Sequence, residues 1–233
     1  MVLKPLTFPF IAAALIVSPA HADELLTYSS GTGFFVTRDG TILTNNHVIE
    51  HCRRITISGA VPMANAKLVA SDAEYDLALL KTDALANDEA HLSSDKQPLR
   101  KSDRVVVVGY PGQAWQTGQV ETREAEITNL KGPRGEEKWL EFSDALKSGN
   151  SGGPLLDTAG NVVGVVAAKG HMVSHDETVE KFDLAISLPV VRRFLDDHNV
   201  RYSEADSGIY LSTEHVTEDA RRFVVNVRCQ VER

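Results

Sequence analysis

The sequence predicts an all-β protein built as barrels or as a sandwich. Short apolar runs recur between turn signals, and few stretches before residue 188 have helical periodicity. The runs at 33–37 and 41–44 flank Arg38-Asp39-Gly40, and Asp-Gly between two apolar runs indicates a hairpin. In the last stretch every odd-numbered residue from 223 to 231 is apolar, which is typical of a half-buried strand. Together these observations predict closely spaced strands joined by short turns.

The other strands are predicted wherever a short apolar run is bounded by turn residues. In chain order they are expected at 54–58, 66–70, 77–81, 105–109, 120–130, 139–142, 154–156 and 162–168. Residues 82–104 are polar and predict a loop. Pro111-Gly112 follows an apolar run, so a boundary between two β lobes is expected near 110–118.

Helical signals come late in the chain. Apolar residues at 190, 191, 194 and 195 share one helix face and predict a helix over 188–198, with Pro189 in its first turn. A second helix is expected at 212–222, capped by Ser212 or Thr213. The alternation that follows predicts a terminal strand with Cys229 facing inward.

Residues 1–22 have the pattern of a signal peptide. Lys4 precedes the apolar run 6–17, and Ala20 and Ala22 match an A-x-A cleavage site. The alternative is a membrane anchor, but a spanning helix needs roughly 20 apolar residues and prolines interrupt this stretch. We therefore expect cleavage after Ala22 and an exported chain, periplasmic or extracellular, that does not remain in the membrane.

Charge and composition argue against a nucleic-acid partner. The formal net charge is −8, and the Lys and Arg residues form no cluster. An apolar fraction of 42% and a charged fraction of 24% are ordinary for a globular protein. The chain has no C-x-x-C pair of the kind that holds structural zinc. We expect no nucleic-acid partner and no cofactor.

The most specific string in the chain is Gly149-Asn150-Ser151-Gly152-Gly153-Pro154. A nucleophilic serine needs an exposed hydroxyl and nearby backbone N–H groups that hold a developing oxyanion. Glycines beside the serine allow the necessary tight turn. The alternative is an ordinary surface loop, in which Gly, Asn and Ser are common.

Two further residues fit as partners of Ser151. His47 follows an apolar strand and can serve as the base that a serine hydroxyl requires at neutral pH. Asp76 comes directly before the run 77–81, where a buried carboxylate would orient the imidazole. Alone, each could be structural. Their order along the chain, His, Asp, Ser, differs from the orders found in α/β-hydrolases and in subtilisin-like enzymes.

One competing motif is His47-Val48-Ile49-Glu50-His51, which matches the H-x-x-E-H signature of some zinc peptidases. Such a site needs a helix that aims both histidines, together with a third ligand. Here the motif follows a strand in a β-rich stretch, and zinc would leave the string around Ser151 unexplained. We therefore expect no metal site.

The strings GTGFFVTRDGTILTNNHVI, DLALLK, GNSGGPLLDTAGNVVGVV and FDLAI resemble the chymotrypsin-fold serine proteases of the HtrA/Deg bacterial branch, over about residues 30–190. This resemblance implies two six-stranded antiparallel β-barrels within a protease domain at 23–200, the first at about 23–110 and the second at about 111–200. A short helix-plus-strand extension at 201–233 is then expected to dock on the protease body. It leaves too little chain for the PDZ domains that follow the protease in full HtrA proteins.

The resemblance also implies the roles of individual residues. His47 is the general base, Asp76 the orienting acid and Ser151 the nucleophile, and the N–H groups of Gly149 and Ser151 form the oxyanion hole. Asp72 is the competing aspartate, but no apolar strand follows it directly.

The primary specificity pocket of this fold is lined by residues just before the nucleophile and by the strand that follows it. In this chain these are Ala145, Leu146, Val166, Ala167 and Ala168. None of them is acidic, so a preference for Arg or Lys lacks its main electrostatic reason. Small or medium apolar substrate side chains are expected.

Cys52 and Cys229 are the two cysteines, and an exported chain permits a disulfide between them. Cys52 lies five residues after His47, and Cys229 points inward from the predicted terminal strand. A bridge would tie the extension to the loop behind the catalytic base. Two unpaired, buried thiols are the alternative.

The sequence thus predicts an exported serine endopeptidase that forms an acyl-enzyme and acts on polypeptides, including unfolded or exported proteins. A peptide-binding pseudoprotease or a periplasmic holdase would use the same cleft without turnover. Pseudoproteases usually lose one triad residue, and this chain keeps all three. Asn150 carries no charge, so the activation switch of digestive trypsins is not expected. The oligomeric state stays open.

Overall fold

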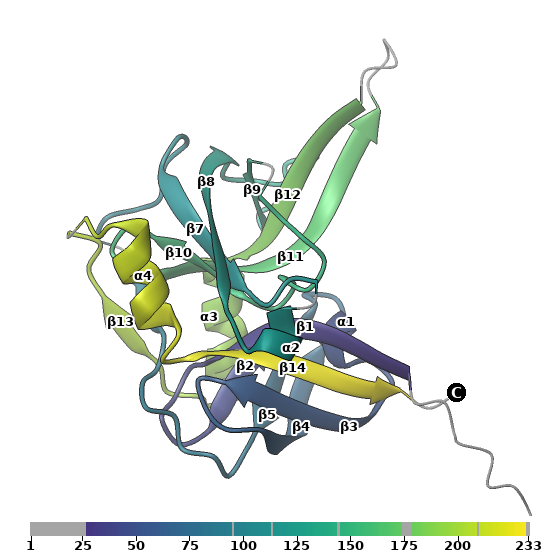
Figure 1. Cartoon of the computed structure of the whole chain (residues 1–233). Coiled ribbons are helices and arrows are strands. Elements are labelled where there is room, and N and C mark those ends of the chain that lie inside the picture. The colour runs from purple at the N-terminus through teal and green to yellow at the C-terminus, as the bar shows by residue number, and fades with distance from the viewer. Residues whose placement is uncertain are drawn as a thin grey trace, which may run out of the picture.

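The computed structural model describes residues 27–231 except residues 95, 113, 144, 174–178 and 209. Strands make up most of it and helices are few and short (Figure 1). The signal peptide predicted at residues 1–22 lies outside the described residues. The prediction of an all-β protein with two six-stranded antiparallel barrels is confirmed.

The first barrel closes with the strand order β1-β14-β3-β4-β5-β2. All of its neighbouring strands are antiparallel. Its strands are β1 (Thr27–Phe35), β2 (Thr41–Thr44), β3 (Cys52–Gly59), β4 (Ala64–Asp72), β5 (Leu77–Lys81) and β14 (Val224–Val231). Five strands therefore come from the start of the chain and the sixth from its end.

The second barrel follows the order β10-β7-β8-β9-β12-β11 and closes by pairing β10 with β11. Its strands are β7 (Arg104–Gly109), β8 (Glu121–Asn129), β9 (Trp139–Phe142), β10 (Pro154–Asp157), β11 (Val162–Val173) and β12 (Val179–Ser187). β11 and β12 extend beyond the barrel as a two-stranded ribbon (Figure 1). Two short strands, β6 (His91–Ser93) and β13 (Ser203–Ala205), join this sheet by parallel pairing.

The helices connect and cover the barrels. They are α1 (Asn46–Ile49), α2 (Ala114–Thr117), α3 (Leu188–Asp197) and α4 (Thr213–Ala220). The two longer ones, α3 and α4, lie where helices were predicted. Ser212 caps α4, and its hydroxyl accepts the backbone N–H of His215.

β7 separates two hydrophobic cores. Val105 and Val107 lie in the core of the second barrel, whereas Val106 and Val108 pack in the core that includes the first barrel. Both faces of the strand are buried, which accounts for its unbroken run of valines. The boundary predicted near residue 110 is therefore wrong, because β7 already belongs to the second barrel. The chain crosses between barrels after Lys81, and Pro111-Gly112 is a turn that ends β7.

β14 is an integral strand of the first barrel. It lies between β1 and β3 and pairs with both along its length. Cys229 is buried as predicted. The prediction that only one face of the strand is buried is wrong for its first half, because Val224 and Asn226 are also fully buried. The Tyr110 hydroxyl donates to the Val224 carbonyl, and the Asn226 amide donates to the Gly31 carbonyl.

A disulfide joins Cys52 to Cys229, which are 177 residues apart in the sequence. Cys52 is the first residue of β3 and follows α1 closely. The bond therefore fixes the terminal strand to the segment that begins just after His47.

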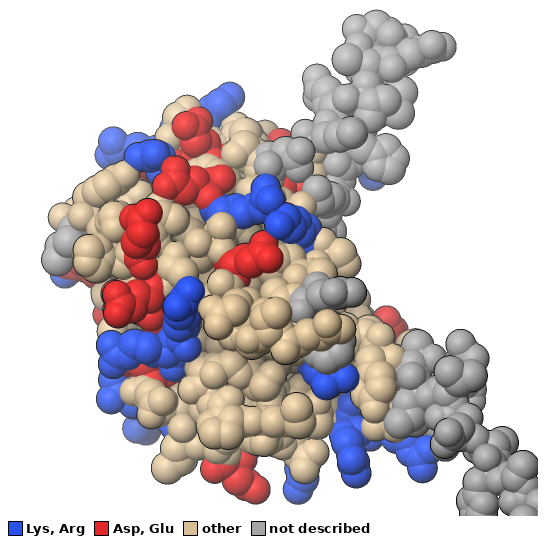
Figure 2. All heavy atoms as spheres, in the orientation of Figure 1, with Lys and Arg blue, Asp and Glu red and all other residues tan. Residues whose placement is uncertain are grey.

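The surface carries mixed charge. On the face in Figure 2, Lys and Arg side chains alternate with Asp and Glu side chains, without a large area of one sign. Among the described residues, no helix is both long and apolar enough to cross a membrane.

Candidate active site

His47 is oriented by a single carboxylate. Its Nδ1 lies 2.7 Å from Oδ2 of Asp76, and its backbone N–H donates to Oδ1 of the same residue at 2.9 Å. Asp76 holds a backbone φ of +57° just before β5, and its carbonyl accepts the Asn46 N–H and the Asn45 side-chain amide. With Nδ1 facing the carboxylate, Nε2 is the nitrogen available to take a proton.

The alternative zinc motif lacks the helix it needs. α1 ends at Ile49, so it does not carry His51. His51 has a backbone φ of +62°, and its side chain is 81% exposed beside Glu50. The two histidines of this motif are therefore not presented by one helix face.

Ser151 lies in a turn whose backbone conformation requires glycine at positions 149 and 152. Gly149 has φ of +101° and Gly152 has φ of +84°, conformations that L residues rarely adopt. A Cβ atom added at Gly152 would lie 2.2 Å from the Thr32 carbonyl oxygen. The glycines on both sides of Ser151 thus let the turn pack directly against β1.

Two backbone N–H groups of this turn are unused. The N–H groups of Asn150, Gly152 and Gly153 each donate to a backbone carbonyl. Within the described part of the chain, those of Gly149 and Ser151 donate to none. Two free N–H groups beside a serine can stabilise an oxyanion.

The Ser151 hydroxyl donates to the Ala167 carbonyl at 3.0 Å. In this rotamer it is not hydrogen-bonded to His47. The two parts of the site meet at Gly31, where an added Cβ atom would lie 2.6 Å from Val48 Cγ1 and 3.0 Å from the Ser151 carbonyl oxygen. The turn carrying Ser151 and the helix carrying His47 therefore pack against the same residue of β1.

Thr32 fixes the turn that carries Ser151, and our sequence analysis missed it. Its N–H donates to the Ser151 carbonyl at 2.8 Å, and its hydroxyl donates to the Gly149 carbonyl at 2.7 Å. The same hydroxyl accepts the Tyr110 N–H, and the Thr32 carbonyl accepts the Thr44 hydroxyl. A fully buried threonine with every polar group engaged holds this turn in one position.

Three of the residues predicted for the pocket, Ala145, Leu146 and Val166, pack in the core of the second barrel, whereas Ala167 packs in the other core. Ala145, Leu146, Val166 and Ala167 are all buried, the last two on β11. The side chain of Ala168 lies outside what the structure describes. Ala167 lies next to Ser151, because its carbonyl accepts the Ser151 hydroxyl.

An acidic side chain lies behind this predicted pocket wall. Oδ2 of Asp183 accepts the N–H groups of Ala145 and Leu146, both at 2.7 Å. Asp183 is in the FDLAI string, yet its role escaped sequence analysis because the carboxylate contacts backbone 37 and 38 residues away. The sequence offered one signal of this role, which is that Asp183 is a charged residue inside an apolar strand pattern.

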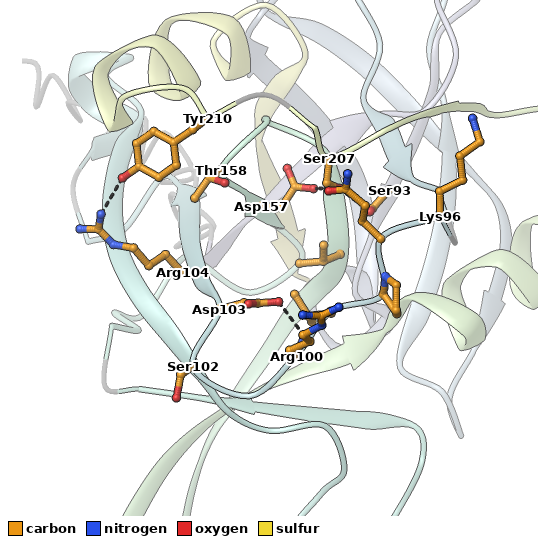
Figure 3. A pocket seen from close by; sticks show the side chains of 14 residues that line it. Ser93, Lys96, Arg100, Ser102, Asp103, Arg104, Asp157, Thr158, Ser207 and Tyr210 are labelled. Carbon is orange, nitrogen blue, oxygen red and sulfur yellow. Dashed lines mark hydrogen bonds between the residues drawn. The ribbon is translucent and has the colours of Figure 1, made fainter.

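A cavity of about 660 Å³ lies elsewhere in the molecule (Figure 3). It is bordered by the connection at 93–104, by the end of β10 and by the segment before α4. Polar contacts already join its walls: Ser207 donates to Asp157, and Arg104 donates to Tyr210. None of the residues predicted for catalysis or for the pocket lines it. The candidate site is therefore defined by the side chains around Ser151.

Comparison with known proteins shows to which family the chain is similar. Residues 31–165 match the trypsin-like peptidase domain. A probable periplasmic serine endoprotease, DegP-like, from Rhizobium meliloti is 35% identical over 154 residues, covering 64% of this chain and 30% of that protein. The chain spans about a third of the length of the curated relatives it matches.

Two solved structures have a similar fold. The serine endoprotease from Yersinia pestis is 27% identical with a TM-score of 0.58, covering 72% of this chain and 56% of that one. The HtrA-type protease AlgW, solved with a decapeptide, is 26% identical with a TM-score of 0.58, covering 72% of this chain and 50% of that one. The resemblance to the HtrA branch is thereby confirmed.

Proposed function

Because the chain belongs to the trypsin-like peptidase family, we propose that it is an exported serine endopeptidase with His47, Asp76 and Ser151 as its catalytic triad. The observation that carries the proposal is the double contact of Asp76 with His47, formed beside a turn that presents Ser151. Orienting an imidazole through Nδ1 is the arrangement that a general base for serine requires.

The reaction follows from these positions. The Ser151 hydroxyl turns from the Ala167 carbonyl towards His47 and gives its proton to Nε2 as Oγ attacks the scissile carbonyl. Asp76 stabilises the imidazolium, and the free N–H groups of Gly149 and Ser151 hold the oxyanion. His47 then protonates the leaving amine, and water hydrolyses the acyl-enzyme with His47 again as base.

The substrate side chain before the scissile bond is proposed to be small or medium and apolar. Ala145, Leu146 and Ala167 are apolar and buried, which favours apolar side chains in this pocket. The Asp183 carboxylate, the nearby acid, is occupied by two backbone N–H groups of the wall. A cleavage profile dominated by Arg or Lys would contradict this specificity.

The proposed location is the periplasm or the extracellular space, with polypeptides as substrates, unfolded or exported proteins among them. Support comes from the signal-peptide pattern at 1–22 and from a relative named as periplasmic. The disulfide between Cys52 and Cys229 is consistent with an oxidising compartment.

Covalent labelling tests the proposed chemistry. A fluorophosphonate should modify Ser151 alone, located by peptide mapping, because the proposed base and the proposed oxyanion donors serve this serine. Ser143 and Ser148 lie on the same loop and are the internal controls. His47→Ala should prevent labelling. Modification of the control serines instead of Ser151 would contradict the assignment.

A peptide-binding pseudoprotease is the second candidate. It is favoured by one observation, the Ser151 hydroxyl bonded to Ala167 rather than to His47. A binder of this kind would retain peptide affinity without being labelled at Ser151. A holdase would likewise remain unlabelled while it suppressed aggregation of an unfolded protein.

A further inference from the structure

Asp183 occupies a buried position next to the proposed substrate pocket. It lies on β12, opposite Phe142 of β9 on one side and Lys169 of β11 on the other. Its exposed fraction is 2%. Phe142 ends β9, so the carboxylate is placed where the chain leaves the barrel towards Ser151.

The carboxylate organises the backbone that follows β9. Two consecutive N–H groups, those of Ala145 and Leu146, converge on Oδ2 at 2.7 Å each. Hydrogen bonds of this length to an ionised acceptor are among the stronger ones in proteins. Successive N–H groups that curl around one anion form a fixed concave backbone, so this segment has one preferred shape while the anion is present.

The two ends of the nucleophile loop are held by different residues. Before Ala145, the Ser143 N–H donates to the Glu126 carbonyl, and after Leu146 the loop is held by Thr32. Between these anchors, Asp183 supplies the hydrogen bonds to the Ala145 and Leu146 N–H groups. Leu146 precedes Gly149 by three residues. Movement of the wall would therefore also displace the turn that carries the N–H groups of Gly149 and Ser151.

We propose that Asp183 is a positioning and specificity-determining residue that fixes the Ala145–Leu146 wall of the substrate pocket. This inference rests on the proposed function. The carboxylate acts through the wall that it holds and makes no contact with substrate. It keeps the apolar side chains of the wall in place. The position of these side chains in turn determines the selectivity for small and medium apolar side chains of the substrate.

Asp157 offers a matched control. It is also buried, at 7% exposure, and lies in the same barrel on β10. Its Oδ1 accepts two backbone N–H groups, those of Ala159 and Asn161, at 2.9 Å each. Loss of this carboxylate removes the same kind of anchor from a turn outside the proposed pocket.

The test compares Asp183→Ala, Asp183→Asn and Asp157→Ala with the unmodified protein, using a peptide library and the rate of fluorophosphonate labelling. Asp183→Ala should lower kcat/KM by about 10- to 100-fold and broaden the preference before the scissile bond, because the wall loses its anchor. Asp183→Asn keeps an acceptor oxygen and should stay within a few-fold. Asp157→Ala should lower the melting temperature while leaving the cleavage profile unchanged.

A second readout does not depend on activity. In a Ser151→Ala background, amide hydrogen exchange of Ala145 and Leu146 should accelerate in Asp183→Ala and remain slow in Asp157→Ala. Unchanged exchange together with an unchanged cleavage profile would overturn the proposal. So would a wild-type preference for Arg or Lys that Asp183→Asn abolishes, because Asp183 would then contact substrate. Failure of the proposed function is seen separately, as an unmodified protein that neither cleaves nor is labelled.

Discussion

At the scale of single residues, the candidate site depends on how backbone and side chain cooperate. Asp76 contacts both the imidazole and the backbone N–H of His47, so one carboxylate fixes the ring and the helix that carries it. Thr32 does the same for the opposite half of the site, where it holds the carbonyl groups of Gly149 and Ser151. Both residues act by restricting geometry before substrate arrives.

Asp76→Asn tests the role of the orienting carboxylate. An amide can donate to Nδ1 and favour the wrong imidazole tautomer, so kcat should fall by about 10⁴-fold while the protein stays folded. The measurement is peptide hydrolysis alongside circular dichroism. Asp72→Asn is the matched control, because Asp72 accepts the Tyr75 N–H at a turn and is not in contact with His47 among the described residues. Equal losses in the two variants would contradict the assignment of Asp76.

The candidate residues Ser151 and His47 could be picked out from the sequence, whereas the residues that hold them in place could not. Ser151 and His47 lie in strings with local signatures of glycines, turns and strand ends. Thr32 and Asp183 have no such signature, because each acts on backbone far away in sequence, Thr32 on a carbonyl 117 residues distant. A polar residue inside a strand says that it needs partners, but not which ones.

At the scale of elements, β14 completes the first barrel, next to the segment that carries His47. The alternation of residues 223–231 predicted a strand, but its neighbours depend on closing a ring between segments nearly 200 residues apart. No local pattern encodes that pairing. Three strands were missed: β6 and β13, which are very short, and β12, in which Lys181 and Asp183 interrupt the apolar pattern.

The disulfide should contribute to both stability and activity. In the chain-entropy model, breaking a disulfide that closes a loop of this length lowers the free energy of unfolding by at most about 5 kcal/mol. Reduction should therefore lower the melting temperature. It should also lower activity, because Cys52 begins β3 just after the helix that carries His47.

The double variant Cys52→Ala/Cys229→Ala is the control for reduction. It should resemble the reduced protein and be insensitive to dithiothreitol in thermal melts and in peptide hydrolysis. Non-reducing peptide mapping should recover the two half-cystines together. Two alkylatable thiols in protein taken from an oxidising compartment would rule the bond out.

At the scale of the whole molecule, Tyr110 links the two barrels. It follows β7, is 2% exposed, and donates its hydroxyl to the Val224 carbonyl of β14 at 3.4 Å. Burial raises the pKa of Tyr110 to about 12, although Arg221 acts in the opposite direction. The junction between barrels therefore contains a phenol that stays neutral when an exposed one would ionise.

This shift predicts an alkaline loss of stability. An unfolded tyrosine ionises near pH 10. The stabilising contribution is thus complete below about pH 10 and is lost as pH rises towards 12, by about 2–3 kcal/mol in total. Urea unfolding between pH 8 and pH 11.5 measures it. The free energy of unfolding should fall less steeply with pH in Tyr110→Phe than in the unmodified protein. In Tyr28→Phe, a change at an exposed position, it should fall as steeply as in the unmodified protein. A Tyr110→Phe slope equal to that of the unmodified protein would refute the coupling.

Turnover of a polypeptide substrate tests whether Ser151 is the nucleophile. The purified protein and its Ser151→Ala and Ser148→Ala variants are compared on an internally quenched, unfolded polypeptide. We expect the unmodified protein and Ser148→Ala to cleave at similar rates, because Ser148 is exposed and lies outside the proposed triad. Ser151→Ala should fall by about 10⁶-fold, to the background of the assay, since the triad acts as a unit. A Ser151→Ala protein that cleaves as fast as the unmodified one would show that Ser151 is not the nucleophile.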